Sequence, residues 1–514
     1  MTDINPITKT DYPDPDVIRV GDTYYMVSTT MYYSPGGAIL KSYDLVNWEI
    51  LTYLYDELDG SEAERLEGGK TNYGKGMWAP SLRYHNGKFY IAFVSHGRED
   101  THLFVADDIC GPWEHRHIGE YFHDCSLLFD DDGKVYIASG NMNIRVVELN
   151  DDLTNPRPGG VDKVIIRDNP DKVGLGYEGS HFYKINGKYV LTLIHWPKES
   201  GRRTEAVFVS DKVDGEYVGQ DVMWDDMGLN NMGVAQGGIV DTPDGKTYAI
   251  LFQDSGAVGR VPVLVPVEWV DNFPVFGTDG LVPKNPVVVS TRPDYKYEPL
   301  YTSKIWKDEK ASTDSVNAEL MPQWQWNHVP DNSLRKPVSG GGISLKTGRI
   351  DVNPVKAKNT LTQRMMLPGC SACVTIDATG LKDGDTAGLI ALEGRYCMLG
   401  IHKRNGRYYL IRLARTKVEK PFAIGFPDDE PGEVLFEREI NCSKVTVRLK
   451  ADFDKMKDEL ITEYVSEDGS EIIGEPFKMS FGLDHFTGVR FGLCCFSQIS
   501  YGGEAVFEQF RYEY

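Results

Sequence analysis

Five segments in the first 285 residues repeat one pattern, and this repeat constrains the fold more than any other feature of the chain. Each has a short apolar run, a tight turn with glycine and then an aromatic-rich run. The five are PDPDVIRVGDTYYMVS, WAPSLRYHNGKFYIAF, HDCSLLFDDDGKVYIAS, YEGSHFYKINGKYVLTL and AQGGIVDTPDGKTYAIL. Asn-Gly and Asp-Gly turns between alternating runs are typical of β-hairpins. Long helical periodicity is absent from this region, so the sequence predicts an all-β fold.

Most repeats continue into a third strand-like run and a polar turn, as in AILKSYDLVNWEI, HLFVADDICGPWEH and AVFVSDKVDGEYV. Three or four strands per unit, in five units of roughly 45–65 residues, predict a five-bladed β-propeller. A solenoid would also stack such units, but the irregular spacing and the tight turns favour the propeller.

The repeat stops near residue 285, and a polar, proline-containing stretch follows that suits a connection between domains. Alternating runs then return, such as SACVTIDATGL and RYYLIRLAR, joined by Gly and Asp turns. They predict a two-sheet β-sandwich. The expected organisation is a propeller at 1–290, a linker at 291–315 and a sandwich at 316–514.

Charge and cysteine usage limit the partners of the chain. The formal net charge of −21 opposes binding to nucleic acid or to an anionic membrane surface. No secretory leader and no apolar run of membrane-spanning length are visible. Eight scattered cysteines in a long chain are typical of reduced thiols, and the CxxC at 370–373 has no second pair to complete a zinc site. We therefore expect a cytoplasmic protein; the sequence says nothing about its oligomeric state.

Aligning the repeats on their turn glycines places one residue of each at the start of its first strand. These residues are Asp14, Ala79, Asp124, Glu178 and Gln236. Because the innermost strands of a propeller line its axis, the five positions face one spot. Three of them are acids, and buried like charges without a function would be costly. Asp11 and Asp16 fall outside this register, and we assign them to turns or to the surface.

Two positioned carboxyl groups are the apparatus of glycoside hydrolysis. One must be protonated to donate to the leaving oxygen, and the other must be ionised to activate water. A third carboxylate beside the acid would raise the acid's pKa by like-charge repulsion and could orient it. This chemistry accounts for three acids rather than two.

The sequence resembles glycoside hydrolase family 43. The stretches that carry the resemblance are YPDPDVIRVGDTYYM, SYDLVNWEI, MWAPSLRYHNGKFYI, HDCSLLFDDDGKVYI and EGSHFYKINGKYV, and together they span the predicted propeller. The resemblance implies an inverting mechanism that needs no cofactor. It makes Asp14 the general base, Asp124 the modulator of the acid's pKa and Glu178 the general acid. It also implies that Arg260 binds sugar hydroxyls and that Trp78 walls the pocket. An ordinary ion-pair role for Arg260 and a blade-core role for Trp78 stay open.

One position departs from the family pattern. Many members carry a histidine at the fifth-blade position, near the axis and often near a bound calcium, where this chain has Gln236. Glutamine can still bond a water or a sugar hydroxyl. The departure weakens the expectation of a structural calcium on the propeller axis, and the metal site stays unknown. His195 could serve the pocket rim, but we expect it on the surface.

The C-terminal region resembles the concanavalin-like domain of xylosidase-type members of the family. In such members a sandwich loop can close one side of the pocket with an aromatic residue. CCFSQISYGG, residues 494–503, is the stretch we assign to this role, with Phe496 or Tyr501 at the tip. The alternative is a hairpin whose aromatics belong to the core. A pocket closed on one side favours attack at chain ends.

The sequence thus predicts an exo-glycosidase that releases xylose or L-arabinofuranose from hemicellulose oligosaccharides. Two alternatives remain open. One is an endo-arabinanase with the same fold, and the other is a propeller that binds sugar without hydrolysing it. The preferred sugar and the linkage are beyond the sequence.

Overall fold

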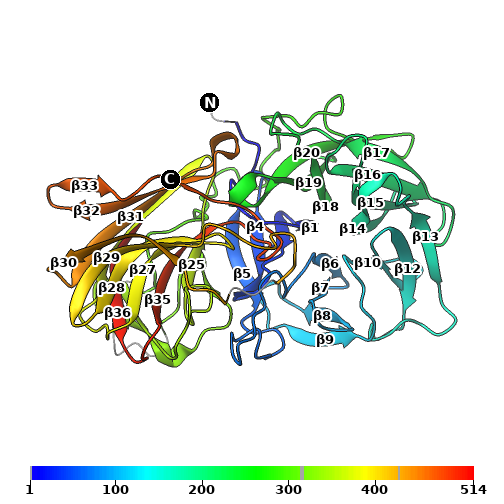
Figure 1. Cartoon of the computed structure of the whole chain (residues 1–514). Coiled ribbons are helices and arrows are strands. Elements are labelled where there is room, and N and C mark those ends of the chain that lie inside the picture. Colours follow the sequence, from blue (N-terminus) through cyan, green and yellow to red (C-terminus); the bar gives the residue numbers. More distant parts are fainter. Residues whose placement is uncertain (1–2, 309, 313–317, 426–428) are drawn as a thin grey trace.

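The computed structural model describes residues 3–308, 310–312, 318–425 and 429–514. In these ranges strands dominate, and the helices are three 3-10 turns, η1 (Gly256–Val258), η2 (Asn332–Leu334) and η3 (Asp454–Met456). Figure 1 shows two β-rich halves, the N-terminal one blue to green and the C-terminal one green to red. Within the described ranges no helix has the length and apolar character needed to cross a bilayer.

The N-terminal half consists of five four-stranded antiparallel blades. Blade 1 contains β1 (Asp16–Val20), β2 (Thr23–Ser28), β4 (Gly36–Ser42) and β5 (Glu49–Tyr55). Blade 2 contains β6 (Ser81–His85), β7 (Lys88–Phe93), β8 (Thr101–Ala106) and β9 (Glu114–Ile118). Blade 3 contains β10 (Ser126–Phe129), β11 (Val135–Ser139), β12 (Asn143–Leu149) and β13 (Asp162–Arg167). Blade 4 contains β14 (Val173–Ile185), β15 (Lys188–Pro197), β16 (Thr204–Ser210) and β17 (Val218–Met223). Blade 5 contains β18 (Val234–Asp241), β19 (Thr247–Asp254), β20 (Arg260–Val270) and β21 (Phe273–Phe276).

The first strands of the blades, β1, β6, β10, β14 and β18, contact one another in a closed ring (Figure 1). The five-bladed propeller is confirmed. Its hairpins follow from their turn residues. Asn86 and Gly87 both have positive φ, of 49° and 80°, and they connect paired residues His85 and Lys88. A two-residue turn with positive φ at both positions matches the twist of the strands it joins, which is why Asn-Gly occurs there.

Each blade consists of strands from one continuous stretch of the chain, so no blade combines an N-terminal strand with C-terminal strands of the propeller. The segment before β1 instead runs along blade 5. Ile7 and Tyr12 donate backbone hydrogen bonds to the carbonyls of Pro262 (2.9 Å) and Arg260 (3.1 Å). These bonds hold the residues just ahead of β1 in place relative to β20.

Asp16 is fully buried on the axis, so its assignment to a turn or the surface is wrong. Its Oδ2 accepts from Arg83 Nη1 and from the Leu82 backbone N–H, both at 2.7 Å. Its Oδ1 accepts from the Val17 N–H at 3.1 Å and lies 3.2 Å from His181 Nδ1. The Arg83 charge and these hydrogen bonds outweigh burial and lower the pKa of Asp16.

The Arg83 guanidinium connects blades around the axis. Besides Asp16 of blade 1, it donates to Ser126 Oγ and the Leu127 carbonyl of blade 3, both at 2.7 Å. It also donates to the Phe182 carbonyl of blade 4 at 3.2 Å. A buried ion pair is tolerated when its remaining donors and acceptors are satisfied, and this one is satisfied by the inner strands themselves.

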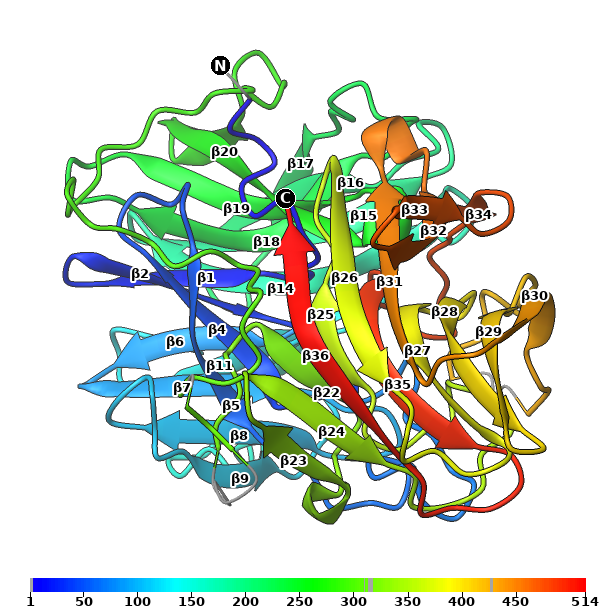
Figure 2. The ribbon, with the colours of Figure 1, turned by 90° about the vertical axis from the view of Figure 1, so that its left-hand side faces the viewer.

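The C-terminal half is a sandwich of two eight-stranded sheets, as expected. The order in the first sheet is β3 (Tyr33–Ser34), β22 (Trp324–Asn327), β25 (Leu361–Arg364), β35 (Arg490–Ser497), β27 (Asp385–Leu392), β28 (Cys397–Arg404), β29 (Arg407–Ala414) and β30 (Glu433–Ile440). The order in the second, seen in Figure 2, is β23 (Arg335–Val338), β24 (Gly342–Lys346), β36 (Glu504–Glu513), β26 (Gly369–Asp377), β31 (Lys444–Asp452), β32 (Glu459–Ser466) and β33 (Gly469–Ile472), with β34 (Phe477–Lys478) on β32. The strand β3 lies in the loop between β2 and β4 of blade 1 and pairs with β22, so one strand of this sandwich sheet comes from the propeller.

The described segment between β21 and β22 is fastened to blade 1. Arg292 pairs with Asp22 at 2.7 Å, and the Tyr43 backbone N–H donates to Tyr297 Oη at 2.8 Å. These contacts hold the first part of the predicted linker against the propeller.

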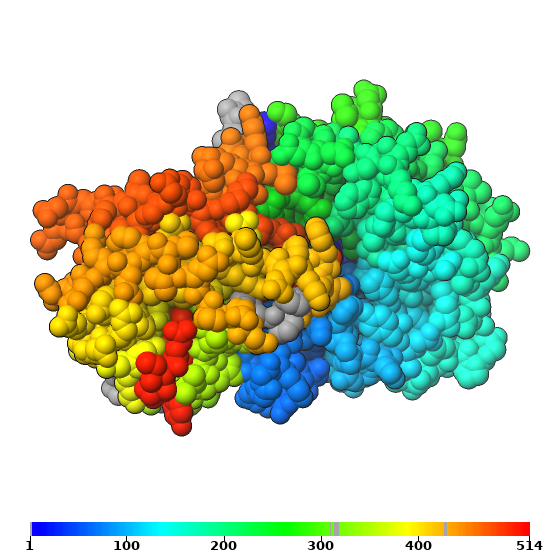
Figure 3. All heavy atoms as spheres, in the orientation of Figure 1, coloured from blue at the N-terminus to red at the C-terminus, as the bar shows by residue number. Residues whose placement is uncertain are grey.

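Asp11 connects the two domains, and its assignment to a turn or the surface is wrong as well. It is buried, and its carboxylate accepts the Arg260 N–H of the propeller at 2.8 Å and the Gly488 N–H of the sandwich at 3.0 Å. Arg364 of the sandwich donates to the Asp11 carbonyl at 2.8 Å. The apolar core of the sandwich extends into the propeller through residues 257, 258 and 261. Figure 3 shows the two halves packed against each other.

We predict that Asp16→Asn destabilises the propeller strongly. The substitution leaves the buried Arg83 charge without a counter-ion, and breaking such a pair costs about 3–5 kcal/mol. Thermal unfolding followed by circular dichroism measures the loss. The control is Asp241→Asn, which breaks the exposed pair with Arg19, worth about 1 kcal/mol or less. Equal melting temperatures for the two variants would contradict a special role for the axial pair.

Candidate active site

Asp14 lies where the N-terminal segment enters blade 1, held by an arginine. It is 5% exposed, and its Oδ1 accepts from Arg260 Nη1 at 2.7 Å. Arg260 is the first residue of β20 and is itself buried. Its Nε and Nη2 find no hydrogen-bond partner in the described part of the chain. Because a buried guanidinium normally uses its donors, these two N–H groups are available for a bound molecule.

Asp124 and Glu178 are joined through the backbone of blade 4. Asp124 Oδ2 accepts the N–H of Gly179, the residue after Glu178, at 3.1 Å. His123 Nε2 lies 3.4 Å from Glu178 Oε2 and 3.8 Å from Asp124 Oδ1, and Asn141 donates to Glu178. The structure therefore brings the second and third predicted acids into one cluster, together with two polar residues that the sequence did not indicate.

Three of the five residues that the repeat alignment places at the start of a first strand share an unusual backbone conformation. Asp14, Asp124 and Gln236 have φ of 51°, 46° and 57°, in the left-handed region that non-glycine residues rarely adopt. In blade 4 the residue after Glu178, Gly179, has φ of 65°. Such conformations are retained where the surrounding structure imposes them, often at functional sites. The repeat thus places a backbone kink, and not only an acidic side chain, at the start of each of these first strands.

Burial and charge set the protonation of the cluster. Burial raises the pKa of Asp14, against the opposing charge of Arg260. Burial also raises the pKa of Asp124 to about 7; His123 opposes this, and the charges of Glu178 and Asp14 add to it. The Asp124 charge raises the pKa of His123 to about 9. Displaced pKa values of this kind, here at Asp124 and His123, are typical of sites that carry out acid–base chemistry.

Aromatic side chains from both domains form a wall beside Arg260. Trp78 of blade 2 stacks on His96 with ring centroids 4.2 Å apart and meets Phe486 edge to face at 5.6 Å. Phe486 comes from the sandwich, in the segment between β34 and β35, and its ring lies 4.3 Å from the Arg260 guanidinium carbon. The sandwich therefore reaches the site.

The aromatic residue of the sandwich that we assigned to the site is corrected. Phe496 lies within β35, is 1% exposed and belongs to the apolar cluster that contains Met31 and Tyr33 of the propeller. It lies on the face of β35 opposite to Leu493 and Cys495, which belong to the sandwich core, and it is buried at the contact between the domains. Tyr501 is exposed, beyond the end of β35. Phe486 takes the place that we had assigned to them. Its surroundings in sequence, FGLDHFTGV, have no alternation or repeat register that would have singled it out. His123 could have been noticed, because it directly precedes Asp124.

Two further expectations concern Gln236 and His195. Gln236 is buried; its N–H donates to Glu205 Oε2 at 2.7 Å, and its side chain packs so closely on Gly179 that a Cβ there would lie 2.7 Å from it. His195 is buried and not on the surface, because it stacks on Tyr177 at 4.4 Å and bonds Asp221 at 2.8 Å.

The part of the axis that Asp16 and Arg83 occupy does not fit a calcium ion. Calcium needs several oxygen ligands. Asp16 is the axial carboxylate of blade 1, and both of its oxygens already accept hydrogen bonds. The Arg83 guanidinium brings a positive charge to the same place, which would repel a cation.

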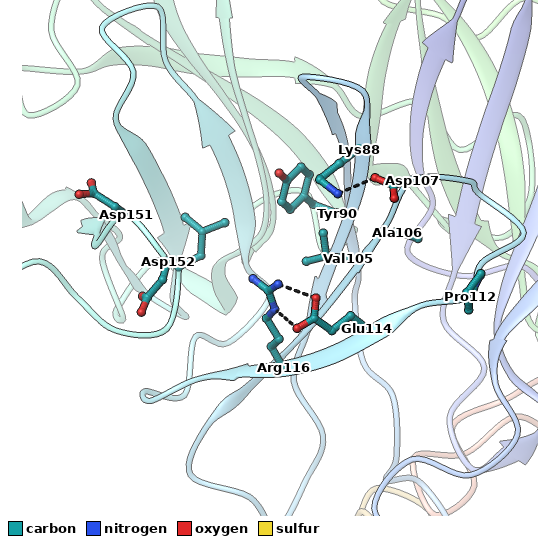
Figure 4. Close-up of a pocket in the computed structure, with 11 residues that line it drawn as sticks. Lys88, Tyr90, Val105, Ala106, Asp107, Pro112, Glu114, Arg116, Asp151 and Asp152 are labelled. Carbon is teal, nitrogen blue, oxygen red and sulfur yellow. Dashed lines mark hydrogen bonds and ion pairs between the residues drawn. The ribbon is translucent and has the colours of Figure 1, made fainter.

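A pocket between blades 2 and 3 lies apart from the acids. Figure 4 shows it over the outer strands, with Lys88 paired to Asp107 and Arg116 paired to Glu114. Because the charged groups satisfy one another there, this pocket offers no acid–base pair comparable to the cluster at the axis.

Comparison with known proteins decides the family. The model of glycosyl hydrolases family 43 matches residues 4–274, and that of the beta xylosidase C-terminal concanavalin A-like domain matches residues 314–513. The chain belongs to glycosyl hydrolase family 43. It is therefore a glycoside hydrolase whose substrate is an oligosaccharide, as the resemblance implied.

Relatives extend over both domains. A beta-xylosidase of Formosa agariphila is 27% identical over 100% of this chain and 90% of its own length. A bifunctional family 43 and CE protein of Bacteroides eggerthii is 36% identical with a TM-score of 0.88; the alignment covers 100% of this chain and 63% of that one. A family 43 hydrolase engineered to show endo-xylanase and exo-arabinofuranosidase activity is 30% identical, with a TM-score of 0.85 and 99% of each chain covered.

We predict that Asp124→Asn lowers the pKa of His123 from about 9 towards its ordinary value of 6.5, because the Asp124 charge is the largest cause of the rise. Titration of the His123 ring by NMR measures the shift. Asp221→Asn, which neutralises a partner of a different histidine, is the matched control and should leave His123 unchanged. A His123 titration that stays near pH 9 in Asp124→Asn would contradict the assignment.

Proposed function

We propose that the protein is an inverting exo-glycosidase that releases xylose or L-arabinofuranose from the ends of hemicellulose oligosaccharides. The observation that carries the proposal is Arg260. Its guanidinium holds the Asp14 carboxylate with one nitrogen, keeps two buried N–H groups without a partner, and is covered by Phe486 of the sandwich. Donors beside a carboxylate and under an aromatic ring suit the hydroxyl groups of one terminal sugar.

The roles follow from these surroundings. Asp14 accepts a proton from water as the water oxygen bonds to the anomeric carbon. Glu178 donates a proton to the leaving oxygen as the glycosidic bond breaks on the opposite face, which inverts the anomeric configuration. Asp124 holds the backbone next to Glu178 and adds negative charge beside it. No cofactor takes part in these steps.

The coverage by Phe486 also separates this proposal from an endo-acting enzyme. An endo enzyme needs a groove open at both ends, whereas here the sandwich packs an aromatic ring against the arginine beside the base. The Formosa agariphila relative bears the name beta-xylosidase, and the engineered relative is described as having exo-arabinofuranosidase activity. Both support the two sugars proposed. A purely sugar-binding propeller would have no need for Asp124 and Glu178 in one cluster.

We also propose a cytoplasmic location. All eight cysteines lie in the described ranges and are free thiols. Cys494 and Cys495 are adjacent and buried. Unpaired cysteines are typical of a reducing compartment. Intact oligosaccharides would then be the substrates that reach the enzyme.

We predict that Glu178→Gln affects poor leaving groups most. Its rate on xylobiose should fall by about 10²–10⁴, the usual contribution of general acid catalysis. On dinitrophenyl xyloside, whose leaving group needs no proton, it should lose far less. Asp14→Asn should lose activity on both substrates alike, because water activation is common to them. Steady-state kinetics measures all four rates.

Asp131→Asn, an exposed change in blade 3, is the control and should keep the parental rates. An equal loss on both substrates in Glu178→Gln would exclude its role as the acid. Proton NMR of the first product formed by the parent enzyme checks stereochemistry, and retention of configuration would exclude inversion. Absence of hydrolysis of xylosides and arabinofuranosides by the parent protein would overturn the proposed function as a whole.

We predict that Phe486→Ala lowers kcat/KM on aryl xyloside by about tenfold or more. The substitution removes the ring that covers Arg260, and hydrogen bonds to that guanidinium weaken when water enters. Tyr501→Ala is the matched control, an exposed aromatic residue of the same domain, and should change kcat/KM little. Comparable losses in the two variants would show that Phe486 acts only through domain stability.

A further inference from the structure

Three histidines gather on the outer strands of blade 2, away from the acid cluster. His102 of β8 pairs in register with His117 of β9, and His115 lies two residues before His117 on the same face. One nitrogen of each ring lies within 4.8 Å of the others. His102 Nδ1 and His115 Nε2 are 2.9 Å apart. The run that begins with His102 predicts a strand, and the sequence pattern does not indicate a site in it.

The spacing is close to that of a metal site. Zinc binds imidazole nitrogen at about 2.0–2.1 Å, which places the ligand atoms of a tetrahedral site roughly 3.3 Å apart. Moving His115 outward by a few tenths of an ångström opens that distance. His115 is exposed and His117 is half-exposed, so the movement is possible and an ion has a path from solvent. Glu114 and Arg116 alternate with these histidines and project to the opposite face, into the pocket of Figure 4.

A hydrogen bond to Ser95 already orients the innermost ring, that of His102. His102 Nε2 bonds Ser95 Oγ at 2.9 Å, which leaves Nδ1 directed at the other two histidines. Metal-binding histidines usually donate their second N–H to such an outer partner. His117 Nδ1 is buried and makes no hydrogen bond in the described part of the chain, and Asp100 Oδ2 lies 3.2 Å from it. The cluster thus contains one ring oriented by Ser95 and one ring that faces the Asp100 carboxylate.

Two of the three rings, those of His102 and His115, have lowered pKa values. Burial, with the neighbouring histidines adding to it, lowers the pKa of His102 to about 3. Burial likewise lowers the pKa of His115 to about 4. Metal ions bind the neutral form of imidazole, but the case for a site rests on the convergence of the three nitrogens. Arg98 is the nearby cation that opposes an ion, and Asp100 neutralises it in a two-pronged pair at 2.7 and 2.8 Å.

An aromatic ladder is the other explanation for the arrangement. His115 stacks on Phe104 with centroids 4.2 Å apart, and His102 stacks on Phe93 at 5.1 Å. Stacking explains why flat rings occur on this face. It does not explain three imidazoles whose nitrogens converge.

We propose that His102, His115 and His117 bind one divalent transition-metal ion of the zinc class, with water at the fourth position. His102 binds through Nδ1 while Nε2–H stays on Ser95. His115 binds through Nε2, and its ring proton moves to Nδ1. Three nitrogen ligands favour zinc, copper or nickel over calcium or magnesium. The site is separate from the glycosidase chemistry and does not depend on the proposed function.

The test uses the full-length chain without a histidine tag, freed of metal with a chelator that is then removed. Titration with zinc chloride is followed by calorimetry, and copper is added separately for electron paramagnetic resonance. We expect one equivalent of zinc assigned to this site and nitrogen hyperfine lines from bound copper. In His115→Gln/His117→Gln, which leaves the buried His102 in place, that equivalent should weaken by about tenfold or more.

The matched control is His85→Gln, a blade 2 histidine that stacks on Phe129 outside the cluster. It should bind zinc as the parent does. The two other groups with metal-ligand spacing, around Glu178 and around Asp484, are untouched in the double variant, so binding there would survive. Unchanged zinc stoichiometry and copper spectrum in the double variant, or no saturable binding up to about 1 mM, would overturn the proposal and leave an aromatic ladder only.

Discussion

The ion pair between Asp16 and Arg83 is the interaction on which the rest of the propeller depends. It lies on the axis, where the five first strands meet, and it reaches blades 1, 3 and 4 from a side chain of blade 2. Moving two charges out of water is expensive, and the arrangement tolerates that cost only because each donor and acceptor is matched. Asp14, the proposed base, lies two residues before Asp16. The hydrogen bonds that fix Asp16 therefore also restrict the position of Asp14.

The contact between the propeller and the sandwich is the second constraint, and it depends on Asp11. Asp11 accepts one hydrogen bond from the backbone of Arg260 and another from the sandwich, two residues after Phe486. One carboxylate therefore holds both the arginine that binds Asp14 and the chain that carries the aromatic cover. The stretch TDYPDPD contains three acids with three tasks. Asp11 joins the domains, Asp14 accepts a hydrogen bond from Arg260, and Asp16 pairs with Arg83 on the axis.

Much of this was accessible from the sequence, for identifiable reasons. The hairpin turns and the glycine register give the blades, because a two-residue turn allows few residues and a strand alternates with period 2. The same register brings Asp124 and Glu178 together, since equivalent positions of different blades face one axis. The errors also share a cause. Asp11 and Asp16 lie outside the register, and their burial depends on Gly488 and Arg83, which are distant in sequence. The sequence does not show which of Phe486 and Phe496 reaches the site, because that depends on which of them lies within a strand.

The sequence by itself determined the repeat, and with it the number of blades, the class of fold and the acids at the start of the first strands. These properties depend on turn residues and on the alternation of apolar and polar residues along each strand, and both are determined by residues that are close in the sequence. Only the tertiary structure decided which side chains complete the site. The contact between Arg260 and Asp14, the cover by Phe486, and the meeting of His102 with His115 and His117 each need segments folded against one another. Their energies depend on burial and on distances that linear order does not contain.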